Sequence, residues 1–463
     1  MRPIALQEII QALNAECRGD ADGQITGVST DTRTIQPGDL FIALSGEKFD
    51  AHDYIDVAVN NGAAAVVVAR PVTCTVPQLL VDDTLTALQQ LAAYYRSLLP
   101  VRVVGITGSN GKTSTRDMTA TVLSAKYRVY STAKNFNNEI GLPKSVLELD
   151  DNVDIAVLEM GMNHFGEISR LTAIAKPEVA LITNVGKAHI GNLGSQENIL
   201  KAKLEILEGL QPDGLLILNG DDPLLKSADT GAFEKSFIGI TGDGLTLQAK
   251  NITVSGGSTA FDVVYNGELI HGQLPVLGNY NVLNALEAIR TGLYFGITVA
   301  EALAALADYR VVGMRQEEEM VQGVTLVKDY YNASPDSCRV ALETLGDHAK
   351  GGRKLAVLGE MLELGEYSEQ EHRALGAMCV RYGIDGAFFI GEHCVAFAEG
   401  FPACAGAFKK EERAELETAL KEALRAGAVK KGDAILIKGS RGMKMEQFYE
   451  MIKEVLQNAS SVI

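Results

Sequence analysis

The chain has 463 residues, of which 46% are hydrophobic and 22% are charged. This composition is typical of globular proteins with buried cores, and the length corresponds to about three domains. The formal net charge is −17 and no run of Lys or Arg occurs. Proteins that bind nucleic acids do so through basic patches, so the sequence argues against a nucleic-acid partner. Any bound phosphates must instead be held locally, by backbone N–H groups and a metal ion.

Targeting and redox signals favour the cytoplasm. The six cysteines are scattered and no pair has C-x-x-C spacing, which argues against a zinc site or a disulfide framework and fits a reducing compartment. Residues 1–14 look like an amphipathic helix with internal charges rather than a signal peptide. The longest apolar runs, such as residues 63–69, are too short to span a bilayer, so no membrane association is expected.

Residues 1–83 predict a small mixed α/β domain. A turn at 37–39 leads into a strand at 40–44. A helix is expected over 51–61, where Gly62 stops it, and a further strand follows at 63–69.

Residues 84–313 predict a central doubly wound domain. A helix at 84–99 precedes apolar runs that are separated by stretches long enough for crossover helices. Continuous apolar runs indicate strands buried on both faces, so we expect a mostly parallel sheet. The predicted strands are 101–106, 155–158, 179–183 and 215–218.

Residues 314–463 repeat this alternation and predict a smaller, Rossmann-like C-terminal α/β domain. Ligands of such sheets lie at the carboxyl ends of the strands. The predicted strands are 326–327, 355–358, 387–390 and 434–437, and the predicted helices are 335–345, 368–382, 411–426 and 444–456.

A glycine-rich phosphate loop follows the first strand of the central domain. It departs from G-x-x-x-x-G-K-[ST] because Ile106 replaces the first glycine, which leaves T-G-x-x-G-K-T. A strand, two glycines, Lys-Thr and a helix in register favour phosphate binding over a simple glycine turn with an exposed lysine. Lys112 would reach the β- and γ-phosphates of ATP, and the Thr113 hydroxyl would bind Mg²⁺. The predicted ATP-binding loop residues are Gly108, Ser109, Asn110, Gly111, Lys112, Thr113 and Ser114.

Three further side chains are candidates for the same edge of the sheet. Glu159 ends one predicted strand and His189 lies just beyond another, and a carboxylate there suits Mg²⁺. Each has an alternative: an exposed strand-end glutamate for Glu159, and a structural histidine for His189. Lys203 would usually be a solvated helix lysine.

These pieces together resemble the Mur ligases, which are ATP-dependent amide ligases of peptidoglycan precursor synthesis. The similar residues are the 107–115 loop, Glu159 to Gly161, His189 and residues 203–206, and the resemblance covers essentially the whole chain. Several motifs are similar to the branch of the family that adds D-alanyl-D-alanine. The resemblance implies ATP, a UDP-N-acetylmuramoyl tripeptide and D-alanyl-D-alanine as substrates and an acyl-phosphate intermediate. We expect a monomer, although the sequence leaves the oligomeric state open.

The substrate motifs are matched residue by residue. Residues 30–33, 37–44 and 49–53 resemble the domain that holds UDP, which implies substrate binding by Asp31 and Arg33. Residues 135–143 resemble the family's Asn-rich substrate loop. That loop implies Asn135, Asn137 and Asn138.

The nucleotide motifs carry three departures. Residues 274–285 resemble the nucleotide-facing helix start with Tyr280 in place of the usual His, which weakens any role for that position. Residues 329–335 are similar to D-S-Y-N-A-N-P, with Tyr330 and Ser334 as departures. Residues 358–365 and 438–441 also match. The D-N-P-R tetrapeptide of the sibling that adds the third amino acid is missing, and the first domain argues against folylpolyglutamate synthases, which share the ligase core.

The resemblance also implies roles in catalysis. Lys112, Glu159, His189 and Lys203 form the catalytic set, with Thr113 and Glu159 on one Mg²⁺ and His189 helping to hold a second. A cationic lysine beside Mg²⁺ would be repelled, so Lys203 is expected to react with CO₂ to form a carbamate that binds metal. ATP would also meet Asn284, Arg315, Asp329 and Asn332, while Ser440 and Arg441 are candidates for reading D-alanyl-D-alanine.

Some alternatives stay open. The sequence does not decide whether the third residue of the peptide is lysine or diaminopimelate. The competing class is a phosphate-loop switch or motor, although the N-K-x-D motif of a GTPase is missing. A ligase would release phosphate only when both peptide substrates are present.

Overall fold

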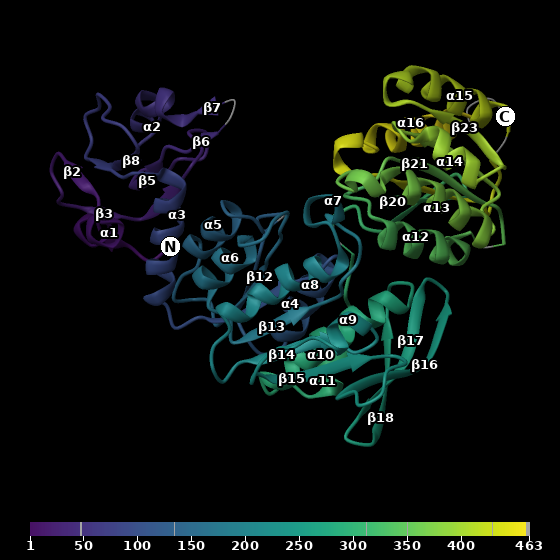
Figure 1. Cartoon of the computed structure of the whole chain (residues 1–463), viewed down its shortest axis with the longest axis horizontal. Coiled ribbons are helices and arrows are strands. Elements are labelled where there is room, and N and C mark those ends of the chain that lie inside the picture. Colours follow the sequence, from purple (N-terminus) through teal and green to yellow (C-terminus); the bar gives the residue numbers. More distant parts are fainter. Residues whose placement is uncertain (47–48, 134, 312, 350, 428, 460–463) are drawn as a thin grey trace.

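The computed structural model describes residues 1–46, 49–133, 135–311, 313–349, 351–427 and 429–459. The chain forms three α/β domains, each built on its own sheet. Figure 1 shows the N-terminal domain in purple at the left, the central domain in blue to green, and the C-terminal domain in green to yellow at the right. The two outer domains lie on the same side of the central domain.

The N-terminal sheet has the strand order β2-β9-β8-β5-β4. All neighbours in it are parallel except β2 and β9. A helical stretch, η1 (Ala51–Tyr54) and α2 (Ile55–Asn60), covers one face, and α1 (Leu6–Leu13) and α3 (Thr84–Ser97) contribute to the core on the other. The strands are β2 (Glu16–Arg18), β4 (Gly27–Ser29), β5 (Asp39–Ile42), β8 (Ala65–Val68) and β9 (Gln78–Leu80).

The central sheet has the order β11-β12-β10-β13-β14-β15-β16-β17-β18. Its pairs are parallel from β11 to β16. The strands β10, β12, β13 and β14 are buried on both faces, as their apolar runs predict. One face packs on α3, α5 (Gly141–Leu147), α6 (Glu167–Ala175) and α8 (Gln196–Leu204). The other packs on α4 (Lys112–Ser124), α10 (Asn279–Tyr294) and α11 (Val299–Leu306). The parallel strands are β10 (Arg102–Thr107), β11 (Val129–Ser131), β12 (Ile155–Glu159), β13 (Val179–Ile182), β14 (Leu215–Asn219) and β15 (Glu234–Gly239).

An antiparallel extension of this sheet was not predicted from the sequence. It consists of β16 (Leu247–Ser255), β17 (Ser258–Tyr265) and β18 (Glu268–Leu274). Burial alternates along β17 because one face of the strand packs on α10 and the other is more open to solvent. Gly-Gly at 256–257 and Asn-Gly at 266–267 are two-residue hairpin turns, a signal that the sequence carried.

The C-terminal sheet has the order β19-β20-β24-β21-β22-β23, and only the β19–β20 pair of these described strands is antiparallel. Helices α12 (Pro335–His348), α13 (Ser368–Arg381) and α14 (Cys394–Gly400) cover one face. Helices α15 (Arg413–Arg425) and α16 (Glu446–Ala459) cover the other. The strands are β19 (Glu317–Val321), β20 (Val324–Asp329), β21 (Lys354–Gly359), β22 (Gly386–Ile390), β23 (Cys404–Phe408) and β24 (Ala434–Lys438).

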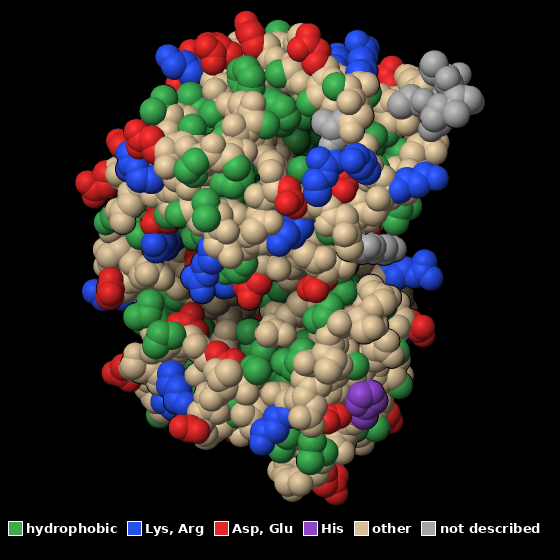
Figure 2. Space-filling view, turned by 90° about the vertical axis from the view of Figure 1, so that its right-hand side faces the viewer, with side chains coloured by type: hydrophobic (Ala, Val, Ile, Leu, Met, Phe, Trp, Pro, Cys, Tyr) green, Lys and Arg blue, Asp and Glu red, His purple; other side chains and the backbone are tan. Residues whose placement is uncertain are grey.

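The surface seen in Figure 2 carries basic and acidic side chains that are interspersed rather than gathered by sign. In the part of the chain that the structure describes, no helix has the length and hydropathy needed to cross a membrane.

Candidate active site

The phosphate loop connects β10 to the first turn of α4. Gly111 caps this helix at φ +84°, a left-handed conformation that glycine adopts without strain. The loop therefore presents backbone N–H groups at a helix N-terminus, where an anion is stabilised. The Lys112 ammonium donates to the Gly108 carbonyl oxygen at 2.7 Å, and burial lowers the pKa of this lysine.

The Glu159 carboxylate lies directly beside the phosphate loop. Its Oε2 accepts the Thr113 hydroxyl at 3.0 Å and its Oε1 accepts the Asn137 side-chain amide at 2.8 Å. The Arg116 guanidinium lies 3.5 Å from Oε2. Because Glu159 is only 3% exposed, the alternative of a solvent-facing strand-end glutamate is wrong.

Lys203 sits in the last turn of α8 and is 2% exposed. Among the residues that the structure describes, no carboxylate pairs with its ammonium group, and the residue lines the same cavity as Lys112. Burial and then the positive charge of Lys112 hold its pKa well below the usual value. The alternative of a solvated helix lysine is therefore wrong.

His189 follows β13 and has φ +64°. Its Nδ1 lies 2.6 Å from Glu363 Oε2, which comes from the C-terminal domain. The histidine lowers the pKa of the Glu363 carboxyl. Sequence reasoning placed His189 at this edge of the sheet but did not anticipate Glu363 as its neighbour.

A cavity of about 570 Å³ opens between the central and C-terminal domains and collects most of the predicted site residues. We refer to it as the interdomain cavity. The predicted residues that line it are Gly108, Ser109, Asn110, Gly111, Lys112, Thr113, Ser114, Asn135, Asn137, Asn138, Glu159, His189, Lys203, Asn284, Arg315, Asp329 and Asn332.

The far wall of the cavity combines α10 with the start of the C-terminal domain. The Asn284 side-chain oxygen accepts the Thr115 hydroxyl at 3.2 Å, which joins α10 to α4. The Arg315 guanidinium lies 4.2 Å from the centre of the Tyr331 ring. Asp329 is buried and pairs with Lys438 at 2.8 Å.

Four predicted substrate residues do not line this cavity. Asp31 and Arg33 pair with each other at 2.6 Å in the N-terminal domain, and the hydrogen bond from Arg33 lowers the pKa of Asp31 to about 2. The buried Ser440 hydroxyl accepts the Leu362 backbone N–H at 2.9 Å, so it holds a loop of its own domain. Arg441 lies 3.5 Å from Glu446.

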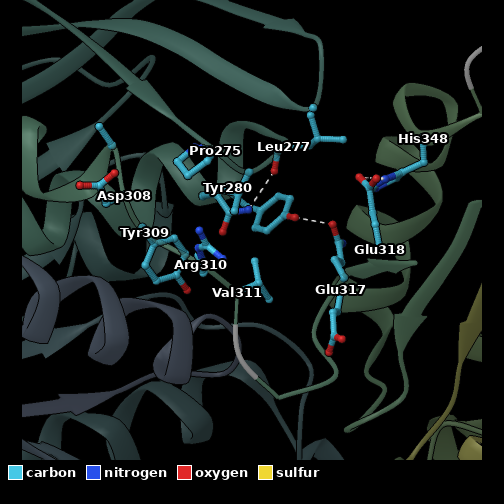
Figure 3. Close-up of a pocket in the computed structure, with 15 residues that line it drawn as sticks. Pro275, Leu277, Tyr280, Asp308, Tyr309, Arg310, Val311, Glu317, Glu318 and His348 are labelled. Carbon is cyan, nitrogen blue, oxygen red and sulfur yellow. Dashed lines mark hydrogen bonds and ion pairs between the residues drawn. The ribbon is translucent and has the colours of Figure 1, made fainter. Parts of the chain in front are cut away.

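A second cavity of about 600 Å³ adjoins the first, and Tyr280 lines both. Figure 3 shows the Tyr280 ring pointing across this pocket, with its hydroxyl hydrogen-bonded to Gln316, next to Glu317 and Glu318. The tyrosine that departs from the family pattern thus connects α10 to the segment that enters the C-terminal domain.

Sequence reasoning missed several buried ionisable groups near the cavities, among them Glu287 and Lys438. Glu287 on α10 is 1% exposed, and its carboxylate accepts the Thr115 hydroxyl at 2.7 Å. Burial raises its pKa to about 8. The sequence signal is a glutamate that stands between apolar residues at 285–289. Lys438 begins the 438–441 motif, which predicts no role for it.

Comparisons with known proteins agree with this geometry. The Mur ligase middle domain matches residues 106–292, the Mur ligase glutamate ligase domain matches 314–441, and the Mur ligase family catalytic domain matches 24–96. The UDP-N-acetylmuramoyl-tripeptide–D-alanyl-D-alanine ligase of Bacillus subtilis is 43% identical over 450 residues, which cover 94% of each chain.

Solved structures show the same fold over the full length. MurF from Acinetobacter baumannii superposes with a TM-score of 0.91 at 31% identity and covers 98% of this chain and 99% of its own. MurF ligase from Thermotoga maritima in complex with ADP gives 0.84 at 31% identity, over 93% and 98%. The chain therefore belongs to the Mur ligase family.

Proposed function

We propose that this enzyme joins D-alanyl-D-alanine to a UDP-N-acetylmuramoyl tripeptide and converts ATP to ADP and phosphate. The observation that carries the proposal is the meeting of Lys112, Glu159 and Lys203 around one interdomain cavity. The names of the relatives and the ADP complex of the Thermotoga maritima protein support the choice of substrates.

The chemistry follows from the poor reactivity of a carboxylate toward an amine. A carboxylate oxygen of the tripeptide attacks the γ-phosphorus of ATP, and ADP leaves as the P–O bond breaks. The dipeptide amine then attacks the acyl carbon, a proton leaves the nitrogen, and phosphate departs. The protein accelerates both steps by positioning and by charge stabilisation, with Lys112 and the N-terminus of α4 directed at the transferring phosphoryl group.

Mg²⁺ would be held at the phosphate loop by Thr113 and Glu159. The donor set fits this cation because a hydroxyl and a carboxylate oxygen already lie 3.0 Å apart in a polar cavity. A bound Mg²⁺ would supply positive charge to the polyphosphate. His189 would help hold a second cation, for which it must part from Glu363.

We further propose that Lys203 acts as a carbamate. A buried ammonium without a carboxylate partner is costly, whereas a neutral amine at this position can attack CO₂. The new N–C bond and loss of a proton would give an anion with two oxygens, which suits a Mg²⁺ site. The proposal concerns the residue that the family resemblance singled out and that the fold buries in the cavity.

The remaining site residues and domain roles extend the proposal. Residues 84–313 would bind ATP through the loop residues 108–114 and Asn284, and residues 314–463 would add Arg315, Asp329 and Asn332. Residues 1–83 would hold UDP through Asp31 and Arg33. Asn135, Asn137 and Asn138 would meet the peptide portion, and Ser440 with Arg441 the dipeptide. We propose that the enzyme works as a cytoplasmic monomer.

The test is a phosphate-release assay with each substrate omitted in turn. We expect release of ADP and phosphate only when ATP, the UDP-tripeptide and D-alanyl-D-alanine are all present, with formation of the UDP-pentapeptide by mass spectrometry. Running lysine- and diaminopimelate-containing tripeptides side by side identifies the third residue. Hydrolysis of ATP at the same rate without either peptide substrate would point instead to a switch or motor and overturn the proposal.

A further inference from the structure

Residues 183–194, which follow β13, touch both the phosphate loop and the C-terminal domain. We call them the bridging segment. On one side, the Ser109 backbone N–H donates to the Asn184 carbonyl at 3.0 Å, and the Asn110 N–H donates to the Asn184 side chain at 2.9 Å. The Thr183 hydroxyl donates to the Asn110 carbonyl at 2.5 Å. The conformation of the bridging segment and that of the phosphate loop are therefore linked.

On its other side, the bridging segment is attached to the C-terminal domain. The Gly191 N–H donates to the Glu363 carbonyl at 3.0 Å, and the Tyr367 hydroxyl donates to the Gly194 carbonyl at 2.8 Å. These bonds use the main chain of the bridging segment. They secure its C-terminal half next to His189.

Lys187 attaches the N-terminal half of the segment through both backbone and side chain. Its N–H donates to Asp336 Oδ2 at 2.8 Å, at the start of α12, and its ammonium donates to Glu371 Oε1 at 2.7 Å, in the first turn of α13. A Cβ on the preceding residue, Gly186, would lie 2.2 Å from Asp336 Oδ2, so a side chain there would displace the Asp336 carboxylate. The two domains are thus held together beside the phosphate loop.

The Lys187–Glu371 pair differs from the many surface ion pairs of this protein. The Glu371 side chain is only 5% exposed, whereas that of Lys187 is 39% exposed. Separation of the domains would remove the lysine from a largely desolvated carboxylate, a costly step. When an exposed ion pair separates, water solvates both side chains, so the free-energy cost is small.

We propose that Lys187 is a positioning residue that couples closure of the C-terminal domain to the conformation of the phosphate loop, through its ion pair with Glu371. The proposal rests on the proposed function, because it assigns the phosphate loop to ATP. On the C-terminal side, the His372 ring accepts the Met361 N–H at 3.0 Å and so attaches the loop that carries Glu363 to α13. Closure would then move the bridging segment, and with it the loop residues Ser109 and Asn110.

The test combines turnover with a measurement of shape on the full-length protein. We expect Lys187→Met and Glu371→Gln each to lower kcat about tenfold, the size of a typical coupling between contacting residues, and to leave KM for the UDP-tripeptide unchanged. X-ray scattering with a non-hydrolysable ATP analogue and Mg²⁺ should show a larger radius of gyration for both variants than for the wild type.

The charge-reversed pair, Lys187→Glu with Glu371→Lys, should recover part of the turnover and of the compact shape. Arg373→Met is the matched control, because Arg373 lies on α13 like Glu371 but pairs with Glu399 of α14, within the C-terminal domain. Single variants with wild-type kcat and scattering would overturn the proposal, and so would a reversed pair no better than the worse single variant. The scattering result does not require ligase activity, so failure of the proposed function would be seen separately, in the wild-type assay.

Discussion

Two lysines are equally buried in this protein but differ in what surrounds them. Lys203 in the central domain and Lys438 in the C-terminal domain are each 2% exposed. The Lys438 ammonium lies 2.8 Å from the Asp329 carboxylate and also donates to the Asn332 carbonyl at 3.2 Å. In the described chain, Lys203 has no carboxylate partner, and the positive charge of Lys112 helps burial to lower its pKa.

The charge of Lys438 is therefore balanced within the described part of the protein, whereas that of Lys203 is not. A buried cation with an anionic partner and hydrogen bonds is compensated by the protein itself. A buried cation without them favours its neutral form, or a ligand or modification that supplies negative charge. The central domain therefore carries electrostatic features of a binding site, whereas the C-terminal lysine fixes the end of β20 next to it.

The largest expected effect is the loss of activity in Lys112→Ala. We expect kcat/KM to fall on the order of 10³-fold or more, because the variant lacks the cation that we propose stabilises the transferring phosphoryl group. The circular dichroism spectrum and the unfolding midpoint should stay close to those of the wild type. Lys126→Ala, an exposed lysine just beyond the same helix, is the control and should retain activity. Near-normal turnover of the folded Lys112 variant would contradict the phosphate-loop assignment.

The paired lysine is expected to affect stability. Lys438→Met should lower the free energy of unfolding by about 3–5 kcal/mol, because it leaves the Asp329 carboxylate buried without its partner. Urea unfolding of the purified variant measures this. The double variant Lys438→Met with Asp329→Leu should regain most of the stability, since both charges are then gone. A single variant as stable as the wild type would show that the pair is dispensable.

The unpaired lysine is expected to affect catalysis. Lys203→Ala should lower kcat about 10²–10³-fold, because the carbamate would stabilise charge at the metal site, and removal of a burial penalty should leave stability unchanged or raised. Wild-type activity should fall in bicarbonate-free buffer and recover when bicarbonate is added. Lys201→Ala, an exposed lysine on the same helix, is the control. Full activity of Lys203→Ala without bicarbonate would exclude the carbamate.

The core of the central domain and the place of Glu159 were predictable from the sequence. The continuous apolar runs predicted β10, β12, β13 and β14, because strands buried on both faces need apolar residues on both. Strand order in a parallel sheet then placed Glu159 beside the phosphate loop, since the carboxyl ends of parallel strands share one edge. The antiparallel hairpins at 247–274 were missed although their turn residues were present.

Contacts between domains were beyond sequence reasoning. Lys187 and Glu371 are 184 positions apart, and both look like ordinary surface charges along the chain. Their pairing, like that of His189 with Glu363, depends on how two independently folded sheets pack. The sequence also does not show whether a polar side chain is exposed. For this reason a solvent-exposed helix lysine stayed an alternative for Lys203 until the fold showed that the residue is buried.

The acidic counterpart of Lys203 gives the smallest and most specific effect. Glu287 is a buried carboxyl whose pKa is raised from 4.5 to about 8 by burial. Among the residues that the structure describes, no cation pairs with it and the Thr115 hydroxyl is its side-chain partner. Below pH 4.5 it is protonated in both states. Between pH 4.5 and 8 only the unfolded chain releases the proton, so stability falls as the pH rises through this window. Between pH 6 and 8 the free energy of unfolding falls by about 2 kcal/mol.

Glu287→Gln should remove that part of the pH dependence, measured by urea unfolding at both pH values. Glu422→Gln, which changes an exposed helix glutamate, should not. If the wild type and Glu287→Gln lose equal stability between the two pH values, Glu287 is ionised in the folded protein. The central domain would then stabilise the ionised Glu287 carboxylate, as the C-terminal domain stabilises the Lys438 ammonium.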